Sequence, residues 1–162
     1  LRDVCLATSA APTYFKPHEV DGVAMLDGGL VANNPDTIAM LEVVRRWPDA
    51  LPRLQMLSIG TAGAVSQRAG PDADKSGAGW APELPIFMMD VQEQTAAAQS
   101  ARVLGARYLR INHVPASGQA AFDRLDLASD AARAQLLDAA GMAAKAAYRS
   151  HRSFVDRILS GR

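Results

Sequence analysis

The chain has 162 residues, which is enough for one domain with a hydrophobic core. Lys plus Arg and Asp plus Glu each number 17, so no net charge attracts nucleic acid, and we expect no nucleic-acid partner. No apolar run approaches the ~20 residues of a membrane-spanning helix, so no transmembrane segment is expected. The single cysteine, Cys5, excludes an internal disulfide, and its apolar neighbours predict a small buried side chain.

The first quarter of the chain alternates helical and extended patterns. Residues 1–11 read as the end of a helix, which the following proline stops. Residues 13–20 contain Tyr and Phe and are predicted to be extended. Asp21-Gly22 then marks a turn, and the apolar run 23–26 predicts a short buried strand.

A strong helix start follows at Asn34-Pro35-Asp36. Asn34 can cap, Pro35 suits the first helical position, and Asp36 complements the positive end of the helix dipole. The helix carries apolar residues at helical spacing up to Pro48, namely Ile38, Leu41, Val44 and Trp47. Residues 54–59 then predict a buried strand.

The middle of the chain predicts a long loop, a helix and a strand. Residues 61–82 are rich in Gly, Ala, Ser and Asp and predict a long loop. Residues 84–104 predict a helix that ends at Gly105, and residues 107–112 alternate as a half-buried strand does. The face assigned to the core of that helix consists of Phe87, Val91, Gln94 and Ala98.

The end of the chain predicts two helices. Ser129 is a candidate N-cap for a helix over 130–140, and Gly141 separates it from a second helix over 142–159. The alternation of helices and strands favours a layered α/β/α fold with a mainly parallel sheet. Three or four short strands are few for a free-standing covered sheet, which indicates that part of the fold lies elsewhere.

Several short stretches carry a resemblance that none of them carries alone, since an Asp-Gly-Gly read by itself is an ordinary tight turn. In order and spacing they resemble the patatin-like phospholipase family, of bacterial type, most densely over residues 7–35. The stretches are Ala7-Thr8-Ser9-Ala10-Ala11-Pro12-Thr13-Tyr14-Phe15, Leu26-Asp27-Gly28-Gly29, Ala32-Asn33-Asn34-Pro35, Leu57-Ser58-Ile59-Gly60-Thr61 and Arg107-Tyr108-Leu109-Arg110-Ile111.

The resemblance implies a serine acyl hydrolase that cleaves lipid acyl esters with a Ser–Asp dyad, in which Asp27 is the catalytic carboxylate. A serine hydroxyl must lose its proton as it attacks, and without a histidine the carboxylate itself accepts that proton. Gly28 and Gly29 are expected to permit a sharp turn and a close approach to the serine elbow. Asn33 and Asn34 are expected to brace the loop through turn and capping hydrogen bonds. No metal or other cofactor is implied.

The serine half of such a dyad is missing from the chain. No Gly-x-Ser-x-Gly elbow occurs in the 162 residues, no glycine-rich loop precedes Asp27, and the first residue is Leu1 instead of Met. We therefore expect residues 1–162 to be the C-terminal portion of a single patatin-like domain. Alone it should be inactive, and it should pair with the missing N-terminal half or with another copy of the chain.

Two alternatives remain open from the sequence. The first is a truncated, non-catalytic scaffold that binds lipid or a protein partner. The second is an α/β interaction module in which Asp-Gly-Gly is only a turn. A cytoplasmic location and a peripheral membrane location are both compatible with the sequence.

Other candidate groups are weaker than Asp27. His18, His113 and His151 have no metal-ligand spacing, and His18 is more typical of a surface or turn residue. Ser9 and Ser58 lack an elbow and are rejected as nucleophiles. Residues 85–89 are favoured as a core-facing helix start over an acyl-chain groove. The basic residues near the C-terminus are favoured as a solvated helix face over a lipid headgroup site, namely Lys145, Arg149, Arg152, Arg157 and Arg162.

Overall fold

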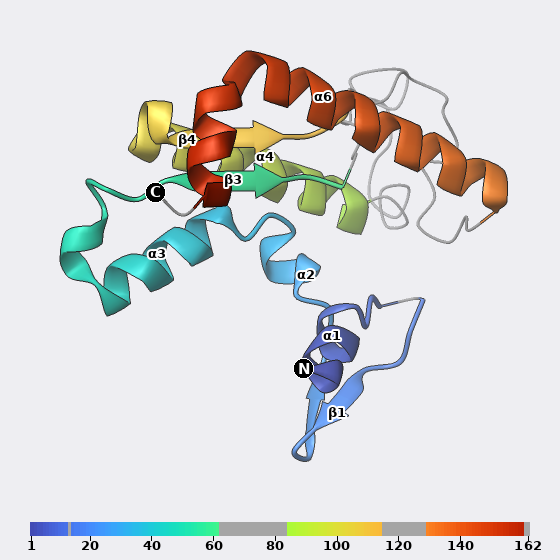
Figure 1. Ribbon diagram of the computed structural model, residues 1–162. Helices are drawn as coiled ribbons and strands as arrows, with labels where there is room; N and C mark the ends of the chain where they lie inside the picture. Colours follow the sequence, from blue (N-terminus) through green and yellow to red (C-terminus); the bar gives the residue numbers. More distant parts are fainter. Residues whose placement is uncertain (13, 62–83, 115–128, 161–162) are drawn as a thin grey trace, which may run out of the picture. The chain divides into compact units, whose positions relative to one another are not determined.

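The computed structural model describes residues 1–12, 14–61, 84–114 and 129–160 (Figure 1). The chain divides into two compact units, one formed by Leu1–Leu41 and Gln67–Ala98, the other by Glu42–Ser66 and Gln99–Arg162. Apart from Thr61, the loop predicted over 61–82 lies outside the described residues. The class is α/β, as predicted, with a parallel pair of strands and a separate antiparallel hairpin.

The first unit begins with helix α1 (Arg2–Thr8) and an antiparallel hairpin of β1 (His18–Val20) and β2 (Val23–Met25). Asp21 and Gly22 have φ of 49° and 76°, so both central residues of the two-residue turn are left-handed, as a type I′ hairpin requires. This confirms the predicted turn. The hairpin leads into the short helix α2 (Gly29–Ala32).

Three expectations for this unit are wrong. Cys5 is exposed, because α1 buries none of its residues. All three residues of β2 are exposed, since β1 is the strand that packs against α1. Of the extended segment predicted over 13–20, Thr13 lies outside the described residues, and Tyr14 and Phe15 are not extended because their amides both donate to the carbonyl of Ala11 and close a turn. His18–Val20 form the strand β1.

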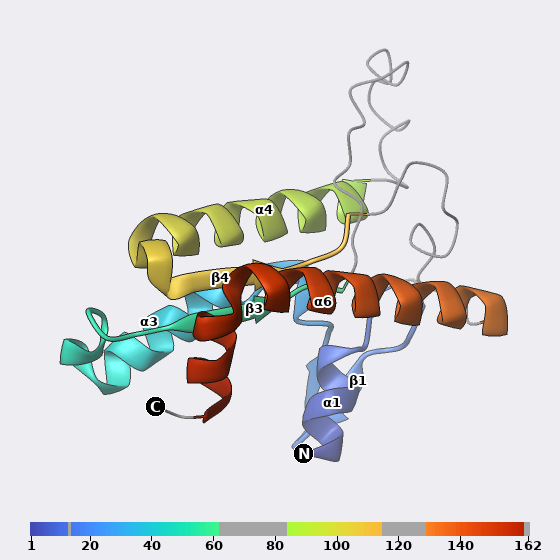
Figure 2. The same cartoon turned by 45° about the horizontal axis from the view of Figure 1, so that its top comes forward.

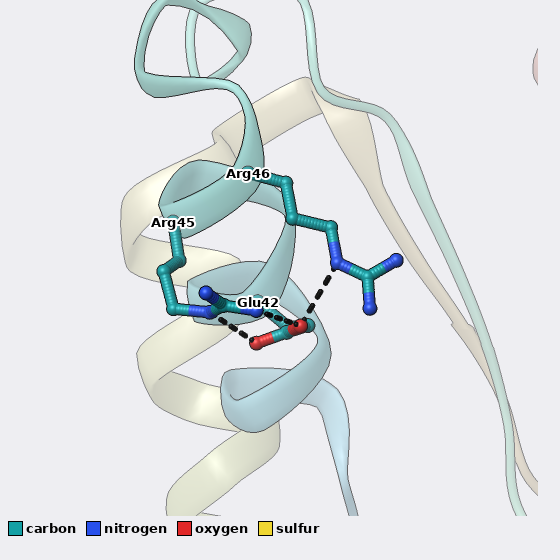
Figure 3. Close-up of polar contacts among 3 residues, drawn as sticks. All are labelled: Glu42, Arg45 and Arg46. Carbon is teal, nitrogen blue, oxygen red and sulfur yellow. Dashed lines mark hydrogen bonds and ion pairs between the residues drawn. The ribbon is translucent and has the colours of Figure 1, made fainter.

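Helix α3 (Asp36–Arg46) begins and ends where the sequence predicts. The side-chain oxygen of Asn34 accepts a hydrogen bond from the backbone N–H of Asp36 at 3.1 Å, which confirms the N-cap. In the last turns, Glu42 accepts hydrogen bonds from the guanidinium groups of Arg45 and Arg46 (Figure 3). The apolar residues predicted on one face stay largely exposed, namely Ile38, Leu41 and Trp47.

The second unit contains a parallel pair of strands, β3 (Met56–Ile59) and β4 (Tyr108–Ile111). Met56 is opposite Tyr108 and Ile59 is opposite Ile111, so a strand is confirmed in both predicted regions. The burial predicted for the first strand is wrong for Ile59, which is exposed, and only Ser58 of β3 is buried. Parallel strands need a long crossover, and helix α4 (Leu84–Leu104) lies between them in the chain. Short 3₁₀ turns precede the strands, η1 (Pro48–Ala50) before β3 and η4 (Gly105–Arg107) before β4.

One face of the parallel pair is covered by the C-terminal part of helix α6 (Asp130–Ser160). The buried cluster consists of Leu109, Phe154 and Val155, with Leu57, Ile111 and Ile158 packed against it. Burial of these side chains supplies the main local driving force for docking α6 on the strands. The core of this unit therefore joins elements from opposite ends of its sequence.

Helix α6 differs from the two helices predicted for this region. It runs without interruption through Gly141, because a single glycine costs only about 1 kcal/mol in an otherwise favourable, alanine-rich helix. The non-helical residue is His151, with φ of −131° and ψ of 30°, and α6 changes direction near its C-terminal end (Figure 2). Ser129 caps the helix as predicted, since its Oγ accepts from the N–H of Ala132 at 3.2 Å.

The basic residues of α6 lie on a solvated face, as predicted. Lys145, Arg149, Arg152 and Arg157 are all exposed, whereas Arg162 lies outside the described residues. Among the described helices, none combines the length and apolar character needed to span a membrane.

The inward face of α4 is also not the predicted one. Phe87, Val91, Gln94 and Ala98 are exposed, whereas Ser100 and Leu104 near the end of the helix are buried. Polar Gln92 and Glu93 turn inward instead, because they hydrogen-bond to the segment around α2. The hydrophobic pattern therefore located the helix but did not orient it.

Candidate functional site

Asp27 stands between β2 and α2. Because Gly28 already has helical dihedrals, the side chain of Asp27 acts as the cap by accepting the N–H of Gly29, the first residue of α2. Its N–H donates to the carbonyl of Ala10 at 3.1 Å, which ties the residue to the end of the α1 segment. Its Oδ1 accepts from the N–H of Gly29 at 2.7 Å, and its carbonyl accepts from the N–H of Leu30 at 3.2 Å. These contacts fix the backbone and one carboxylate oxygen of Asp27 together.

The two glycines after Asp27 are required mainly for space. Gly28 has ordinary right-handed dihedrals, φ of −62° and ψ of −20°, so the sharp turn does not need a glycine backbone there. A Cβ on Gly29 would lie 3.1 Å from Oδ1 of Asp27 and 3.2 Å from Cε of Met89. A Cβ on Gly28 would meet Oγ1 of Thr8 at 3.3 Å. Gly29 therefore allows the carboxylate to approach the helix closely.

The segment after α2 is held by helix α4. Nδ2 of Asn33 donates to Oε2 of Glu93 at 3.3 Å, and Nδ2 of Asn34 donates to the backbone carbonyl of Glu93 at 3.3 Å. Nε2 of Gln92 donates to the carbonyl of Leu30 at 3.2 Å. The structure thus brings all five predicted site residues, Asp27, Gly28, Gly29, Asn33 and Asn34, into one short segment braced from a distant helix.

Sequence reasoning missed Gln92 and Glu93. They stand about sixty positions after the residues they contact, and no spacing rule relates the two segments. The available signal was a pair of polar residues inside a largely apolar helical run, which indicates inward polar contacts when the rest of the run is not solvent-facing.

Ser9 and Ser58, which the sequence analysis rejected as nucleophiles, both form structural hydrogen bonds. Oγ of Ser9 donates to the carbonyl of Cys5 at 2.7 Å, as a residue that closes a helix does. Ser58 is buried in β3, and its Oγ accepts from Nη1 of Arg110 at 2.6 Å. Neither serine is placed in a strained elbow by these contacts.

His18 follows the less specific of its predictions, whereas the core-facing helix start predicted over 85–89 is wrong at Phe87 and Met88. Nε2 of His18 lies 3.1 Å from Oδ1 of Asp3, so this histidine pairs the hairpin with α1. Residues 85–89 lie in the first turns of α4, where Phe87 and Met88 are exposed and Met89 is half-buried beside Gly29. Within the described ranges, no group of three or more His, Cys, Asp or Glu side chains is placed to hold a metal ion.

The chemistry available at Asp27 follows from its partners. Its carboxylate is half-buried, and Oδ1 is engaged by Gly29. In the part of the chain that the structure describes, Oδ2 accepts no hydrogen bond, and the carboxylate forms no ion pair. A carboxylate with one oxygen fixed and the other available can accept a proton from a hydroxyl group placed beside it.

A comparison with known families places this segment. Residues 1–40 match the family model described as patatin-like phospholipase. Over these residues the chain is similar to the patatin-like phospholipase family. All five residues of the Asp27 segment fall inside the matched range, whereas Gln92 and Glu93 lie beyond it.

Several known proteins that are similar to this chain are phospholipases by name. A "cGAMP-activated phospholipase" of Vibrio cholerae is 46% identical over 71 residues, covering 39% of this chain and 20% of that protein. One of the same name from Pseudomonas aeruginosa is 34% identical over 113 residues, covering 68% of this chain and 34% of the relative. The human "Calcium-independent phospholipase A2-gamma" is 44% identical over 55 residues, covering 34% of this chain and 7% of the relative.

The chain thus spans no more than about a third of the length of these relatives, whose names support membership in a family of lipid hydrolases. No solved structure matches the chain significantly.

Proposed function

We propose that this chain is the C-terminal portion of a patatin-like domain and supplies the catalytic carboxylate, Asp27, of a lipid acyl hydrolase. The nucleophilic serine would come from the N-terminal portion of the same domain. The observation that carries the proposal is the arrangement of the Asp27 carboxylate: Gly29 holds Oδ1 at 2.7 Å, and Oδ2 has no hydrogen-bond partner in the described residues.

In the proposed reaction, the serine Oγ attacks the carbonyl carbon of a fatty-acyl ester while Oδ2 of Asp27 accepts the hydroxyl proton. Backbone amides of the N-terminal portion stabilise the oxyanion. The ester C–O bond then breaks, and the leaving alcohol takes the proton from Asp27. Water attacks the acyl-serine, Asp27 accepts a proton from the water, and that proton returns to the serine as the fatty acid leaves.

The remaining segment residues have supporting functions in this proposal. Gly28 and Gly29 leave room for the carboxylate and for the approaching serine elbow, while Asn33 and Asn34 hold the segment against α4. The proposed partners are a lipid acyl-ester substrate and the N-terminal half of the domain. Phospholipids are the substrate class favoured by the names of the relatives.

The test separates the capping function of Asp27 from its proposed function as a base. Asn and Ser cap helices about as well as Asp, so Asp27→Asn and Asp27→Ser keep the hydrogen bond to Gly29 but cannot accept the serine proton. In the full-length protein, both variants should lower kcat/KM for a phospholipid or a p-nitrophenyl acyl ester by about three to four orders of magnitude.

The matched control is Asp21→Asn, which removes one carboxylate from the exposed hairpin turn, where Asn tolerates the left-handed backbone. It should leave activity within about twofold of the unmodified protein, as an exposed surface change does. Unchanged activity of Asp27→Asn would reject the dyad. A full-length protein that binds lipid vesicles but hydrolyses no ester would instead favour the non-catalytic scaffold.

A further inference from the structure

The turn of α4 that contains Gln92 and Glu93 makes three hydrogen bonds to the segment that follows Asp27. Gln92 binds the carbonyl of Leu30, while the side chain and backbone of Glu93 bind Asn33 and Asn34 respectively. These bonds fix α2 and the residues that follow it, and the backbone N–H that holds the Asp27 carboxylate belongs to the first residue of α2.

The amide of Asn33 is oriented by Glu93. A carboxylate only accepts hydrogen bonds, so the Asn33 amide must present its Nδ2 to Oε2 of Glu93 and its Oδ1 to the other side. That Oδ1 lies 3.4 Å from the position of a Cβ on Gly29. The Asn33 side chain therefore spans the distance between Glu93 and Gly29, the residue that binds Asp27.

We propose that Glu93 is a positioning residue of the Asp27 site and acts through Asn33. This inference rests on the proposed function of Asp27 as the base. Loss of the Glu93 carboxylate frees the Asn33 amide, α2 loses one of its contacts to α4, and the carboxylate of Asp27 samples orientations that no longer meet the serine hydroxyl. A misplacement of about 1 Å can lower a rate by up to ~100-fold, so a remote residue of this kind has a measurable effect.

The first test compares Glu93→Ala, Glu93→Gln and Gln94→Ala in the full-length protein. Glu93→Ala removes the acceptor for Asn33 and should lower kcat about tenfold, with KM within about twofold, because substrate binding does not involve this residue. Glu93→Gln retains an acceptor oxygen and should recover most of the lost kcat. Gln94→Ala changes the adjacent exposed position of α4 and should have no effect. Equal kcat values for Glu93→Ala and Gln94→Ala would overturn the proposal.

The second test asks whether Glu93 acts through Asn33. In a double-mutant cycle, Asn33→Ala combined with Glu93→Ala should be no slower than the slower single variant, because both remove the same contact. Independent, multiplicative effects would overturn the proposed connection.

A third test exchanges the hydrogen-bond donor of Asn33 and the acceptor of Glu93. It needs no alanine variant, so it does not depend on whether such a variant folds. Asn33→Asp places two carboxylates against each other and should lower kcat, whereas Asn33→Asp with Glu93→Gln lets the new amide donate to the new carboxylate and should restore it. Failure of this rescue would contradict the proposal. If Asp27→Asn retains activity, the proposed function fails; if Asp27→Asn is inactive while every Glu93 variant is fully active, only the positioning inference fails.

Discussion

Asp27 and Asn34 are two helix caps in the same unit. They accept the same kind of hydrogen bond but differ in the contacts of their second polar atom. The side-chain oxygen of Asp27 accepts from the N–H of Gly29 at 2.7 Å, and that of Asn34 accepts from the N–H of Asp36 at 3.1 Å, two residues on in each case. Asn34 is buried, and its Nδ2 also donates to Oδ2 of Asp36 and to the carbonyl of Glu93. Both polar atoms of the Asn34 side chain thus take part in structural hydrogen bonds.

Asp27 differs from Asn34 because one of its side-chain oxygens takes no part in the cap. It is half-buried and charged, it begins a helix of only four residues, and one carboxylate oxygen has no partner in the described part of the chain. A cap that is saturated serves stability alone, whereas a cap with an unused acceptor is compatible with proton transfer. The chemistry open to a capping residue therefore depends on the polar atom that the cap does not use.

The largest expected effect comes from exchanging the two residue types. Asp27→Asn should abolish nearly all esterase activity, about a thousandfold or more, while the free energy of unfolding changes by less than about 0.5 kcal/mol, because the cap is kept. Activity is measured with an acyl ester, and stability by urea unfolding followed by circular dichroism. If Asp27→Asn unfolds the protein instead, its carboxylate is structural, and the distinction between the two caps is lost.

The reciprocal change, Asn34→Asp, should act on stability. It sets a carboxylate oxygen where Nδ2 now faces Oδ2 of Asp36 and the carbonyl of Glu93, in a buried place. The expected loss is on the order of 3 kcal/mol in the free energy of unfolding. Asn34→Ser keeps the cap and removes only the donor, so it should cost about half as much. Equal stability of Asn34→Asp and the unmodified protein would show that this cap is not saturated.

Which of these features the sequence predicts depends on how far apart the interacting residues are. The Asp21-Gly22 turn, the Asn34 cap and the β3 and β4 strands were predicted correctly, because their causes lie within a few neighbouring residues. Asp27 was placed by resemblance, and its cap to Gly29 is equally local.

Burial and orientation were predicted less well because they depend on distant partners. Cys5 and β2 have apolar neighbours but stay exposed, since a local apolar run does not supply a covering layer. The contact between Asn33 and Glu93 joins positions sixty residues apart, and only the folded chain identifies it. Gly141 was given too much weight as a helix breaker, because one glycine is overcome by a favourable helix around it.

A smaller effect is expected from the space around Asp27. Gly29→Ala places a Cβ 3.1 Å from Oδ1 of Asp27 and 3.2 Å from Cε of Met89, so the carboxylate and the methionine must shift by a few tenths of an ångström. We expect kcat to fall about tenfold, whereas the free energy of unfolding changes by less than about 1 kcal/mol, since alanine favours the helix. Gly28→Ala, the matched control, meets only Oγ1 of Thr8 at 3.3 Å and should lower kcat less. A larger loss of kcat in Gly28→Ala than in Gly29→Ala would mean that activity depends more on the space beside Thr8 of α1 than on the space beside Asp27.

The smallest effect concerns Glu42, a surface carboxylate whose two oxygens both accept hydrogen bonds. Nε and Nη2 of Arg45 bind both oxygens of Glu42 at 2.9 and 2.8 Å, and Nε of Arg46 binds Oε1 at 3.0 Å. The hydrogen bond from Arg45 lowers the pKa of Glu42, with a smaller contribution of the same sign from Arg46, and the pKa of Arg45 is raised in turn. Because both groups are exposed, solvent and salt weaken the pair.

The sign of its pH dependence follows from the lowered pKa. In the unfolded chain Glu42 has its ordinary pKa of about 4.5, so its contribution to stability is complete above that pH and is lost as the pH falls through the lower pKa of the folded state. Glu42→Gln should therefore reduce the difference in Tm between pH 7 and pH 3 by a small amount. Arg45→Gln should reduce it more than Arg46→Gln, because Arg45 has the larger effect on the carboxylate. Equal effects of the two arginine variants would mean that the pair acts through total charge instead of through the two-pronged hydrogen bond.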